Sequence, residues 1–428
     1  MMRSGLVLLL LSFAPSVVSS QEQPTGARLR AVLEQVRAGE QSEAALLRRV
    51  SNWGDAGTRA IVALLSGKGE AEEVPIVLNA DEQAFLRSAL GSASSKVAVK
   101  AIEDTIGRKA SLGERMRAIE LIGIAGNADS IRPLFAIASK LDEVERRHPL
   151  VERQLVGALR SILERDPAAY RSISSSLRKL EVDLLPSVAR ALGEAGSGRA
   201  VPLLDNLLGR SPELTLISLE AFGQLKRWSV ECASGNCAVS VSGYLGSPDP
   251  KTRRQAVLAL GALRDVGSFS EILMMLEDPD PRVRRSSLRA LQGLTGKSWA
   301  EDQERWQDWY AQEELWFEVE FPELLSQLDG PSIGRSAEAL RQMSFHPLFA
   351  YEISKAIAPF LHHSEETVAL AACHTLVRLE DPSVPEILID VLEDDRTDVK
   401  TAAWSGLRRL TGEQLPAEGD AWRALLEG

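Results

Sequence analysis

The sequence has few aromatic residues, few cysteines and no long apolar run. Aromatic residues make up 5% of its 428 residues, and it contains 3 Cys, 31 Gly and 20 Pro. Three cysteines cannot cross-link a chain of this length, which excludes a disulfide scaffold, and the Gly and Pro contents exclude collagen. A membrane-spanning helix needs roughly 18 or more consecutive apolar residues. No stretch approaches that length, so no membrane span is predicted.

The residues that are abundant are typical of a globular helical protein. Hydrophobic residues make up 44% of the chain and charged residues 25%. This apolar content excludes a disordered chain, which could not offset the entropy of ordering. Leu and Ala are frequent, and they are the two best helix formers. An all-α fold is therefore predicted.

Residues 1–20 are interpreted as a secretory signal peptide, with a buried N-terminal helix as the alternative. Arg3 supplies a positive start, residues 6–11 form a short apolar run, and Ser19 and Ser20 precede a cleavage before Gln21. We therefore expect an exported protein, periplasmic or extracellular. Removing this segment removes one basic residue, so the net charge falls from −11 to −12. So acidic a chain is a poor candidate for binding nucleic acid or an anionic membrane surface.

The most informative pattern is a repeat of about 31 residues. The segment DPKTRRQAVLAL at 249–260 recurs as DPRVRRSSLRAL at 280–291. Each copy begins with Asp-Pro, which indicates a helix start: Asp accepts hydrogen bonds from free N–H groups of the first turn, and Pro has no N–H to leave unpaired. Apolar residues follow at helical spacing. Weaker copies on both sides alternate with second helices, such as those near Pro133, Pro202 and Pro385.

The repeat unit is read as helix, turn, helix. Neither helix can bury its apolar face alone, so neighbouring units must stack into one continuous core. Gly and Ala at the inner positions allow the helices to approach closely.

The phrase D-P-x-V-R-x-x-A/S-x-x-A-L resembles the second helix of a HEAT repeat, particularly of the short bacterial HEAT-like kind. The resemblance covers most of residues 75–412, is strong in 249–294 and 365–412, and is faint before residue 110. It implies a right-handed α-solenoid of stacked helix pairs with a concave surface, and a role in protein binding. One branch of the family contains lyases that attach bilin chromophores. Another holds a di-iron centre with His-Glu dipeptides, which this chain lacks.

A longer duplication divides the chain further. Leu294-Thr295-Gly296 recurs as Leu410-Thr411-Gly412, and Trp306 recurs as Trp422, both after 116 residues. Gly after a helix indicates a left-handed C-cap, and the Trp-bearing helix that follows is predicted to cover the end of a stack. Similar endings are familiar in exported bacterial HEAT-repeat proteins. The predicted organisation is a signal peptide at 1–20, a region of divergent helical repeats at 21–110, a main solenoid at 111–330 ending in a Trp-rich segment, and a C-terminal block with an end cap at 331–428.

Three groups of residues are candidates for a site. The tryptophans 299–316 could form a stacking platform for a sugar or a peptide, or could pack within a cap, which the duplication of Trp306 favours. Arg254 and Arg285 belong to a basic ladder that could hold an acidic ligand or pair with neighbouring acids. Cys232 and Cys237 are predicted to form a disulfide, with free thiols as the alternative. The possible binding surface thus comprises Trp299, Trp306, Trp309, Trp316, Arg254 and Arg285.

No motif gives a reason to propose an enzyme, a cofactor or a metal. A Gly-x-Ser-x-Gly turn, a phosphate loop, a zinc-binding His-Glu-x-x-His helix and a dinucleotide fingerprint are all absent. The prediction is therefore a non-enzymatic scaffold that binds another protein or a cell-envelope component. Two alternatives stay open: a HEAT-like lyase-type enzyme, whose intracellular setting conflicts with residues 1–20, and a carbohydrate-binding module that uses the tryptophan cluster.

Overall fold

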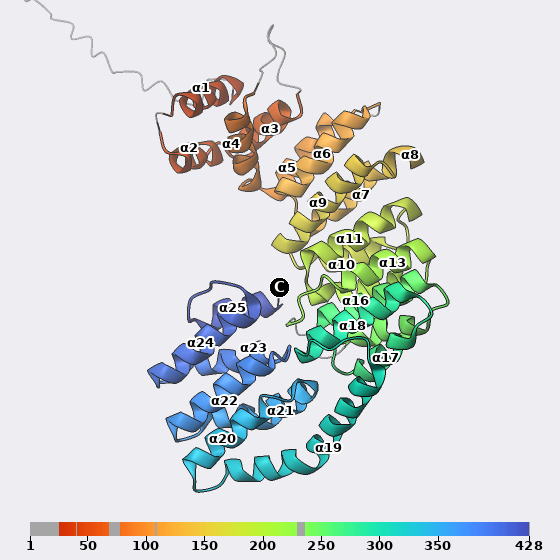
Figure 1. The fold of residues 1–428 in the computed structure, drawn as a ribbon. Helices are drawn as coiled ribbons and strands as arrows, with labels where there is room; N and C mark the ends of the chain where they lie inside the picture. The colour runs from red at the N-terminus through yellow and green to blue at the C-terminus, as the bar shows by residue number, and fades with distance from the viewer. Residues whose placement is uncertain (1–24, 40, 68–77, 108, 229–235, 428) are drawn as a thin grey trace, which may run out of the picture. The chain divides into compact units, whose positions relative to one another are not determined.

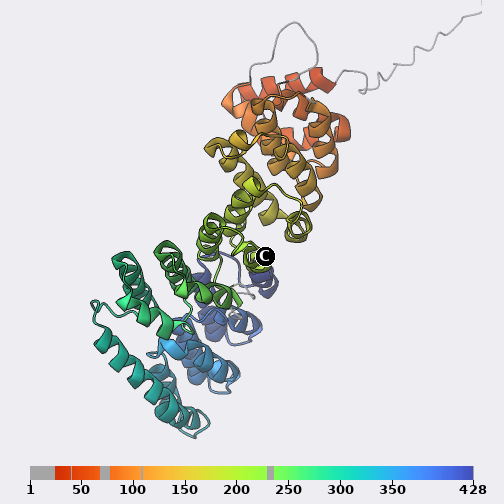
Figure 2. The same ribbon diagram turned by 90° about the vertical axis from the view of Figure 1, so that its right-hand side faces the viewer.

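The fold is described from a computed structural model, which covers residues 25–39, 41–67, 78–107, 109–228 and 236–427 (Figures 1 and 2). Within these residues the regular elements are α-helices and short 3-10 helices, and no strand occurs, which confirms the all-α prediction. The chain divides into two compact units, Met1–Gly107 and Arg108–Gly428. The predicted signal peptide at residues 1–20 lies outside the described residues.

The first unit contains a buried carboxylate at the start of α4 (Ala80–Gly91). Asn79 and Glu82 cap α4 reciprocally, each side chain accepting the other residue's backbone N–H at 2.8 Å. Glu82 is fully buried, and Arg37 of α1 pairs with it at 2.5 Å, which ties α1 to the start of α4. Residues 52–53 form the turn between α2 and α3. The described helices of this unit are α1 (Thr25–Ala38), α2 (Glu43–Ser51), α3 (Gly54–Leu65), α4 (Ala80–Gly91) and α5 (Ser95–Thr105).

The second unit begins with two layers of helices, here called the N-block (residues 109–302). One layer is a continuous row in which each helix packs on the next. The row consists of α6 (Leu112–Ala125), α9 (Pro149–Arg165), α11 (Leu185–Ala195), α13 (Pro212–Phe222), α16 (Pro250–Leu263) and α18 (Pro281–Thr295). The other layer contains α7 (Ile131–Ala138), α10 (Ala169–Ser176), α12 (Val201–Leu207), α15 (Asn236–Ser242) and α17 (Phe269–Met274), and the short α8 (Glu143–Arg146) lies before α9.

Glycine-to-alanine contacts let the helices of the row approach closely, as the repeat predicts. A Cβ atom added at Gly123 of α6 would lie 2.6 Å from the Cα of Ala158 in α9. At Gly193 of α11 it would lie 2.7 Å from the Cα of Ala221 in α13. Real Cβ atoms do not come so close to backbone atoms, so these two positions require glycine. The same kind of contact, at 3.0 Å from a Cβ, recurs further along the row between Gly261 and Ala290.

The Asp-Pro starts of α16 and α18 behave as the sequence predicts. The Asp249 carboxylate accepts the backbone N–H groups of Lys251 and Thr252 at 3.3 and 3.1 Å, and Asp280 accepts that of Arg282 at 2.7 Å. In both helices Pro occupies the first position. Hydrogen bonds donated by the Thr252 hydroxyl and by backbone N–H groups lower the pKa of the Asp249 carboxyl.

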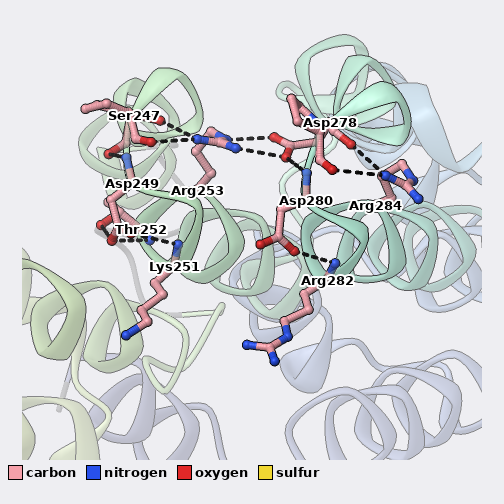
Figure 3. A network of polar contacts seen from close by, with 11 residues as sticks. Ser247, Asp249, Lys251, Thr252, Arg253, Asp278, Asp280, Arg282 and Arg284 are labelled. Carbon is pink, nitrogen blue, oxygen red and sulfur yellow. Dashed lines mark hydrogen bonds and ion pairs between the residues drawn. The ribbon is translucent and has the colours of Figure 1, made fainter.

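Arginines tie each of these helix starts to the next loop (Figure 3). Arg253 donates from Nη1 to the Ser247 carbonyl oxygen at 2.8 Å and forms a two-point ion pair with Asp278, at 2.6 and 2.9 Å. Arg284, one repeat later, donates to the Asp278 carbonyl oxygen at 2.9 Å and pairs with Glu301 at 2.7 Å. Because the Asp278 side chain is only 3% exposed, this is a largely desolvated tie rather than a surface ion pair. The hydrogen bonds from Arg253 lower the pKa of Asp278.

The rest of the second unit, here called the C-block (residues 329–427), repeats the end of the N-block after 116 residues. Its helix α22 begins and ends 116 residues after α16, and α24 begins and ends 116 residues after α18. Both final helices end at a glycine in the left-handed conformation, Gly296 with φ 73° and Gly412 with φ 79°. The helices of this block are α20 (Ile333–Met343), α21 (Ala350–Ile357), α22 (Glu366–Leu379), α23 (Val384–Ile389), α24 (Thr397–Thr411) and α25 (Gly419–Glu427).

A single long helix, α19 (Gln303–Leu328), joins the two blocks (Figures 1 and 2). In its first half Trp309 and Tyr310 pack on Phe269 of α17. In its second half Trp316 and Leu328 enter the apolar core of the C-block. The Trp-rich segment is therefore shared: it closes the N-block and opens the C-block.

The glycine contacts lead to a test with a matched control. Gly193→Ala places a methyl group against the backbone of α13, and we expect a loss of about 1–3 kcal/mol in the free energy of unfolding. Gly157→Ala in α9 meets no atom within 4 Å, so the better helix propensity of Ala should give a gain of about 0.5–1 kcal/mol. Urea denaturation followed by circular dichroism measures both, and equal effects at the two sites would contradict the close-contact argument.

A second test compares two adjacent arginines. Arg253→Met leaves the Asp278 carboxylate buried without its counterion, and we expect a loss of about 3–5 kcal/mol. Arg254 is exposed, so Arg254→Met should change the free energy of unfolding by no more than about 0.5 kcal/mol. Thermal and urea denaturation measure the free energy of unfolding of each single variant against the wild type. If both are as stable as the wild type, the arginine tie contributes nothing to the stack.

Candidate functional site

Trp306 lies in the interior rather than on a surface. It is fully buried, and its Nε1 donates to the Ala300 carbonyl oxygen at 3.1 Å. Trp422 is fully buried as well, and its Nε1 donates to the Pro416 carbonyl oxygen at 2.7 Å. The two donors and the two acceptors are each separated by 116 residues. Each indole therefore fastens a helix to the loop that precedes it: Trp306 holds the linking helix α19, and Trp422 holds α25 at the end of the C-block.

Trp316 is buried in the C-block, 8% exposed. Its ring stacks on His346, with 3.3 Å between ring centroids, and lies 5.8 Å from the ring of Phe321. His346 Nδ1 is 2.9 Å from a carboxylate oxygen of Glu313, which is itself buried. Trp306 and Trp316 therefore offer no open ring face to a ligand.

Trp299 and Trp309 are partly exposed, but cations lie over their rings. The Lys297 ammonium is 4.9 Å from the ring centroid of Trp299 and 4.6 Å from that of Trp309. The Arg305 guanidinium lies 4.4 Å from the Trp299 ring. These distances are within the range of cation–π attraction. The flat faces that a sugar ring would stack on are thus partly occupied by the protein's own side chains.

The basic ladder has two sets of arginines with different surroundings. Arg253 and Arg284 point along the loops and take part in the ties described above. Arg254 and Arg285 follow them directly in sequence and are exposed, on neighbouring helices of the row. Further basic residues at helical spacing extend this surface, here called the basic ridge, which comprises Lys251, Arg254, Arg282, Arg285 and Arg289, all of them exposed.

An ion cluster that the sequence did not suggest joins the two blocks. Glu380 of the C-block accepts from Arg264 of the N-block and lies 3.5 Å from Arg227 and 3.6 Å from Arg409. Burial and the nearby Arg264 lower the pKa of Arg227, and Glu380 opposes that shift. Arg264 and Glu380 end α16 and α22, which correspond under the duplication, and each has a left-handed φ of 54°. The only sequence signal for this pair is that its members stand 116 residues apart.

The described cysteines, Cys237 and Cys373, are buried. Cys373 is a buried free thiol, and burial raises its pKa to about 12, so it stays protonated and unreactive. Cys237 is buried, whereas Cys232 lies outside the described residues, so their disulfide stays a prediction. His363 accepts the backbone N–H of Glu365 at 3.0 Å. No group of three metal-ligating side chains gathers anywhere in the described ranges.

Among the helices of the described residues, none combines the length and the apolar character needed to cross a bilayer.

Comparison with known proteins identifies the repeat. Residues 241–302, which span α16 and α18 with their Asp-Pro starts, match a family model described as HEAT repeats. These residues carry HEAT repeats. The helix pairs that the sequence predicted in this segment are therefore of the predicted kind, and the basic ridge belongs to the same segment.

The chain also resembles solved structures at low identity. They include an engineered protein (15% identity over 91% of this chain and 96% of that one, TM-score 0.29) and a second engineered protein (14% identity over 50% and 96%, TM-score 0.22). Importin beta shares 14% identity over 90% of this chain, which covers 53% of that protein, with a TM-score of 0.34. No curated protein matches the sequence. The assignment depends on the family match and on the helix pairs themselves.

The tryptophan cluster leads to a third test. Trp306→Ala removes a fully buried ring, and we expect a loss of about 3–5 kcal/mol in the free energy of unfolding. Trp309→Ala, at a partly exposed position, should cost clearly less. Chemical denaturation measures both losses. A glycan array then compares the wild type with the folded Trp309→Ala variant: glycan binding lost only in the variant would indicate a binding role for the ring, and unchanged arrays a packing role. Wild-type-like stability of Trp306→Ala would contradict its assignment to the interior.

Proposed function

We propose that the protein is an exported scaffold without enzymatic activity, and that it holds an acidic partner protein or an acidic cell-envelope component on its basic ridge. The observation that carries the proposal is the ridge itself. Five basic side chains are exposed on two neighbouring HEAT-repeat helices, in a protein whose net charge is −11. Such a local concentration of one sign attracts a partner of the opposite sign and fixes its orientation.

The surroundings of the ridge support this interpretation. The carboxylates of the same repeats are committed to structure: the partly exposed Asp249 caps α16, and the buried Asp278 is held by Arg253. The exposed arginines Arg254 and Arg285 have no comparable ion pair among the described residues; Arg285 donates only to a backbone carbonyl of its own helix, that of Pro281 at 3.2 Å. The side chains that stabilise the stack, such as Arg253, are therefore different from those that a partner could contact, Arg254 and Arg285.

Export is proposed on the pattern of residues 1–20, namely Arg3, the short apolar run and the small residues before Gln21. The absence of enzymatic activity is proposed because the paired charges of the repeats cap helices or join loops. The carbohydrate-binding module gains no specific support, since the tryptophan rings are buried or lie against Lys297 and Arg305. No observation on the described residues favours the HEAT-like lyase.

A charge-reversal pair tests the proposal. The mature protein, residues 21–428, is used to capture partners from an exported-protein extract, and the captured proteins are quantified by mass spectrometry. We expect Arg254→Glu with Arg285→Glu to lower capture of the main partner about tenfold, equivalent to about 1.4 kcal/mol from two rim charges. Arg171→Glu with Arg178→Glu makes the same change in net charge at exposed positions elsewhere and should leave capture within about twofold.

Raising the salt concentration should weaken capture by the wild type, because exposed charges are screened. Equal capture by the two double variants would show that the ridge is not the binding surface.

A further inference from the structure

The contact between the two blocks leaves a cavity of about 480 Å³. One wall comes from the N-block, where the turn after α16 contributes residues 263–267. The facing wall comes from the C-block, with residues 348–349 and 351–352 around the start of α21 and residues 381–382 after α22. Tyr310 of the linking helix α19 also lines it. The volume is in the range of cavities that bind small molecules or inserted side chains.

Three of the residues that line the cavity are aromatic. Tyr310, Phe349 and Tyr351 all line it. Tyr310 is held in place by stacking on Phe269, with 5.1 Å between ring centroids. Tyr351 is 47% exposed, so part of its ring remains open to an incoming group. The faces of aromatic rings carry negative potential and attract cations.

The charged groups of the cavity are mostly carboxylates. Asp265, Glu352 and Asp381 line it, against one basic residue, Arg264. That guanidinium is committed to Glu380, so it is not available to an anionic ligand. Asp265 accepts the Ser268 backbone N–H and Asp381 that of Ser383, both at 2.9 Å, but these donors carry no charge, so the negative groups of the lining still outnumber the positive one.

The surroundings of the wall carry further negative charge. The Tyr310 hydroxyl hydrogen-bonds with Glu314, and Glu271 lies near it; burial, this hydrogen bond and these charges together raise the pKa of Tyr310. Burial also raises the pKa of Asp381, although hydrogen bonds from Ser383 and the charge of Arg227 oppose the shift. A poorly solvated carboxylate gains stability from a nearby cation. Arg227 supplies part of that stabilisation to Asp381 but also pairs with Glu380, and the described lining itself holds no cation besides Arg264.

We propose that this cavity binds a basic side chain, lysine or arginine, presented by a segment of another protein. The aromatic rings and the excess carboxylates select an organic cation, and the room beside Tyr351 admits the chain that carries it. Because the walls belong to different blocks, the bound segment bridges them at the same place as the Glu380 cluster. This site is separate from the basic ridge and takes a ligand of the opposite charge, so it does not rest on the proposed function.

Fluorescence anisotropy with a labelled peptide tests the proposal. The probe is a flexible Gly-Ser heptapeptide with one central arginine, and the comparison peptide has norleucine in its place. We expect the arginine peptide to bind at least about fivefold more tightly to the full mature chain. We also expect Glu352→Gln and Tyr351→Ala each to weaken its binding about two- to fivefold, the loss of one charge or one ring.

Matched controls keep the result specific. Glu386→Gln removes an exposed carboxylate outside the cavity, and Phe345→Ala removes a ring that is 48% exposed and also outside it. Both should leave the affinity within about twofold, as should the ridge variant Arg254→Glu with Arg285→Glu. Thermal denaturation confirms that each variant is folded, and both cavity positions are exposed enough to tolerate the change.

Three results would overturn the proposal. The first is equal affinity for the arginine and norleucine peptides. The second is equal weakening by the cavity variants and by their controls. The third is that free N-acetyl-arginine amide competes as well as the peptide on a molar basis, which would make the cavity a site for a small cation and not for a protein segment.

Discussion

The close approach of neighbouring helices is the constraint on which the rest of this structure depends. A helix pair of this repeat has an apolar face that it cannot cover by itself, and the next pair must come near enough to cover it. Gly123 against Ala158 and Gly193 against Ala221 set that separation, because a side chain at either glycine would collide with backbone atoms. A tightly spaced row needs small residues at its contacts, which explains why Leu and Ala are plentiful and aromatic residues scarce.

Once the helices are that close, the loops at their ends come together and their polar groups must be satisfied. In the N-block Arg253 serves this purpose, joining the Ser247 carbonyl oxygen to the Asp278 carboxylate. In the C-block the corresponding groups are the His363 carbonyl oxygen and Asp394, and Arg396 joins them at 2.7 and 2.7–2.9 Å. The hydrogen bonds from the Arg396 guanidinium lower the pKa of the Asp394 carboxyl to about 2. Arg253 and Arg396 stand at different positions of the repeat. The same link between a carbonyl oxygen and an aspartate therefore recurs in both blocks, but a different position of the repeat supplies the arginine.

The duplication also explains how the blocks are joined. Arg264 and Glu380 occupy the same position in their blocks, at the ends of α16 and α22, and both adopt a left-handed φ. For residues other than glycine such a conformation costs about 1 kcal/mol or more, and here it brings two opposite charges together. Around this pair lie Arg227, Arg409 and the aromatic cavity. The structure thus separates two surfaces of opposite character, a basic ridge on the HEAT repeats and an acidic, aromatic cavity where the blocks meet.

The sequence by itself determined the helix pairs, their starts and their ends. Asp-Pro at 249 and 280 and glycine at 296 and 412 act on hydrogen bonds within one or two turns, so their effect can be read from neighbouring residues. The same holds for Trp306 and Trp422, whose duplication indicated a packing role. Only the tertiary structure decided that Arg253 is tied down while Arg254 is exposed, that α19 belongs to both blocks, and that Arg264 meets Glu380. Those outcomes depend on contacts between residues 25 to 116 positions apart. Such contacts follow from how the helices stack and where the chain turns, and no local pattern of residues specifies them.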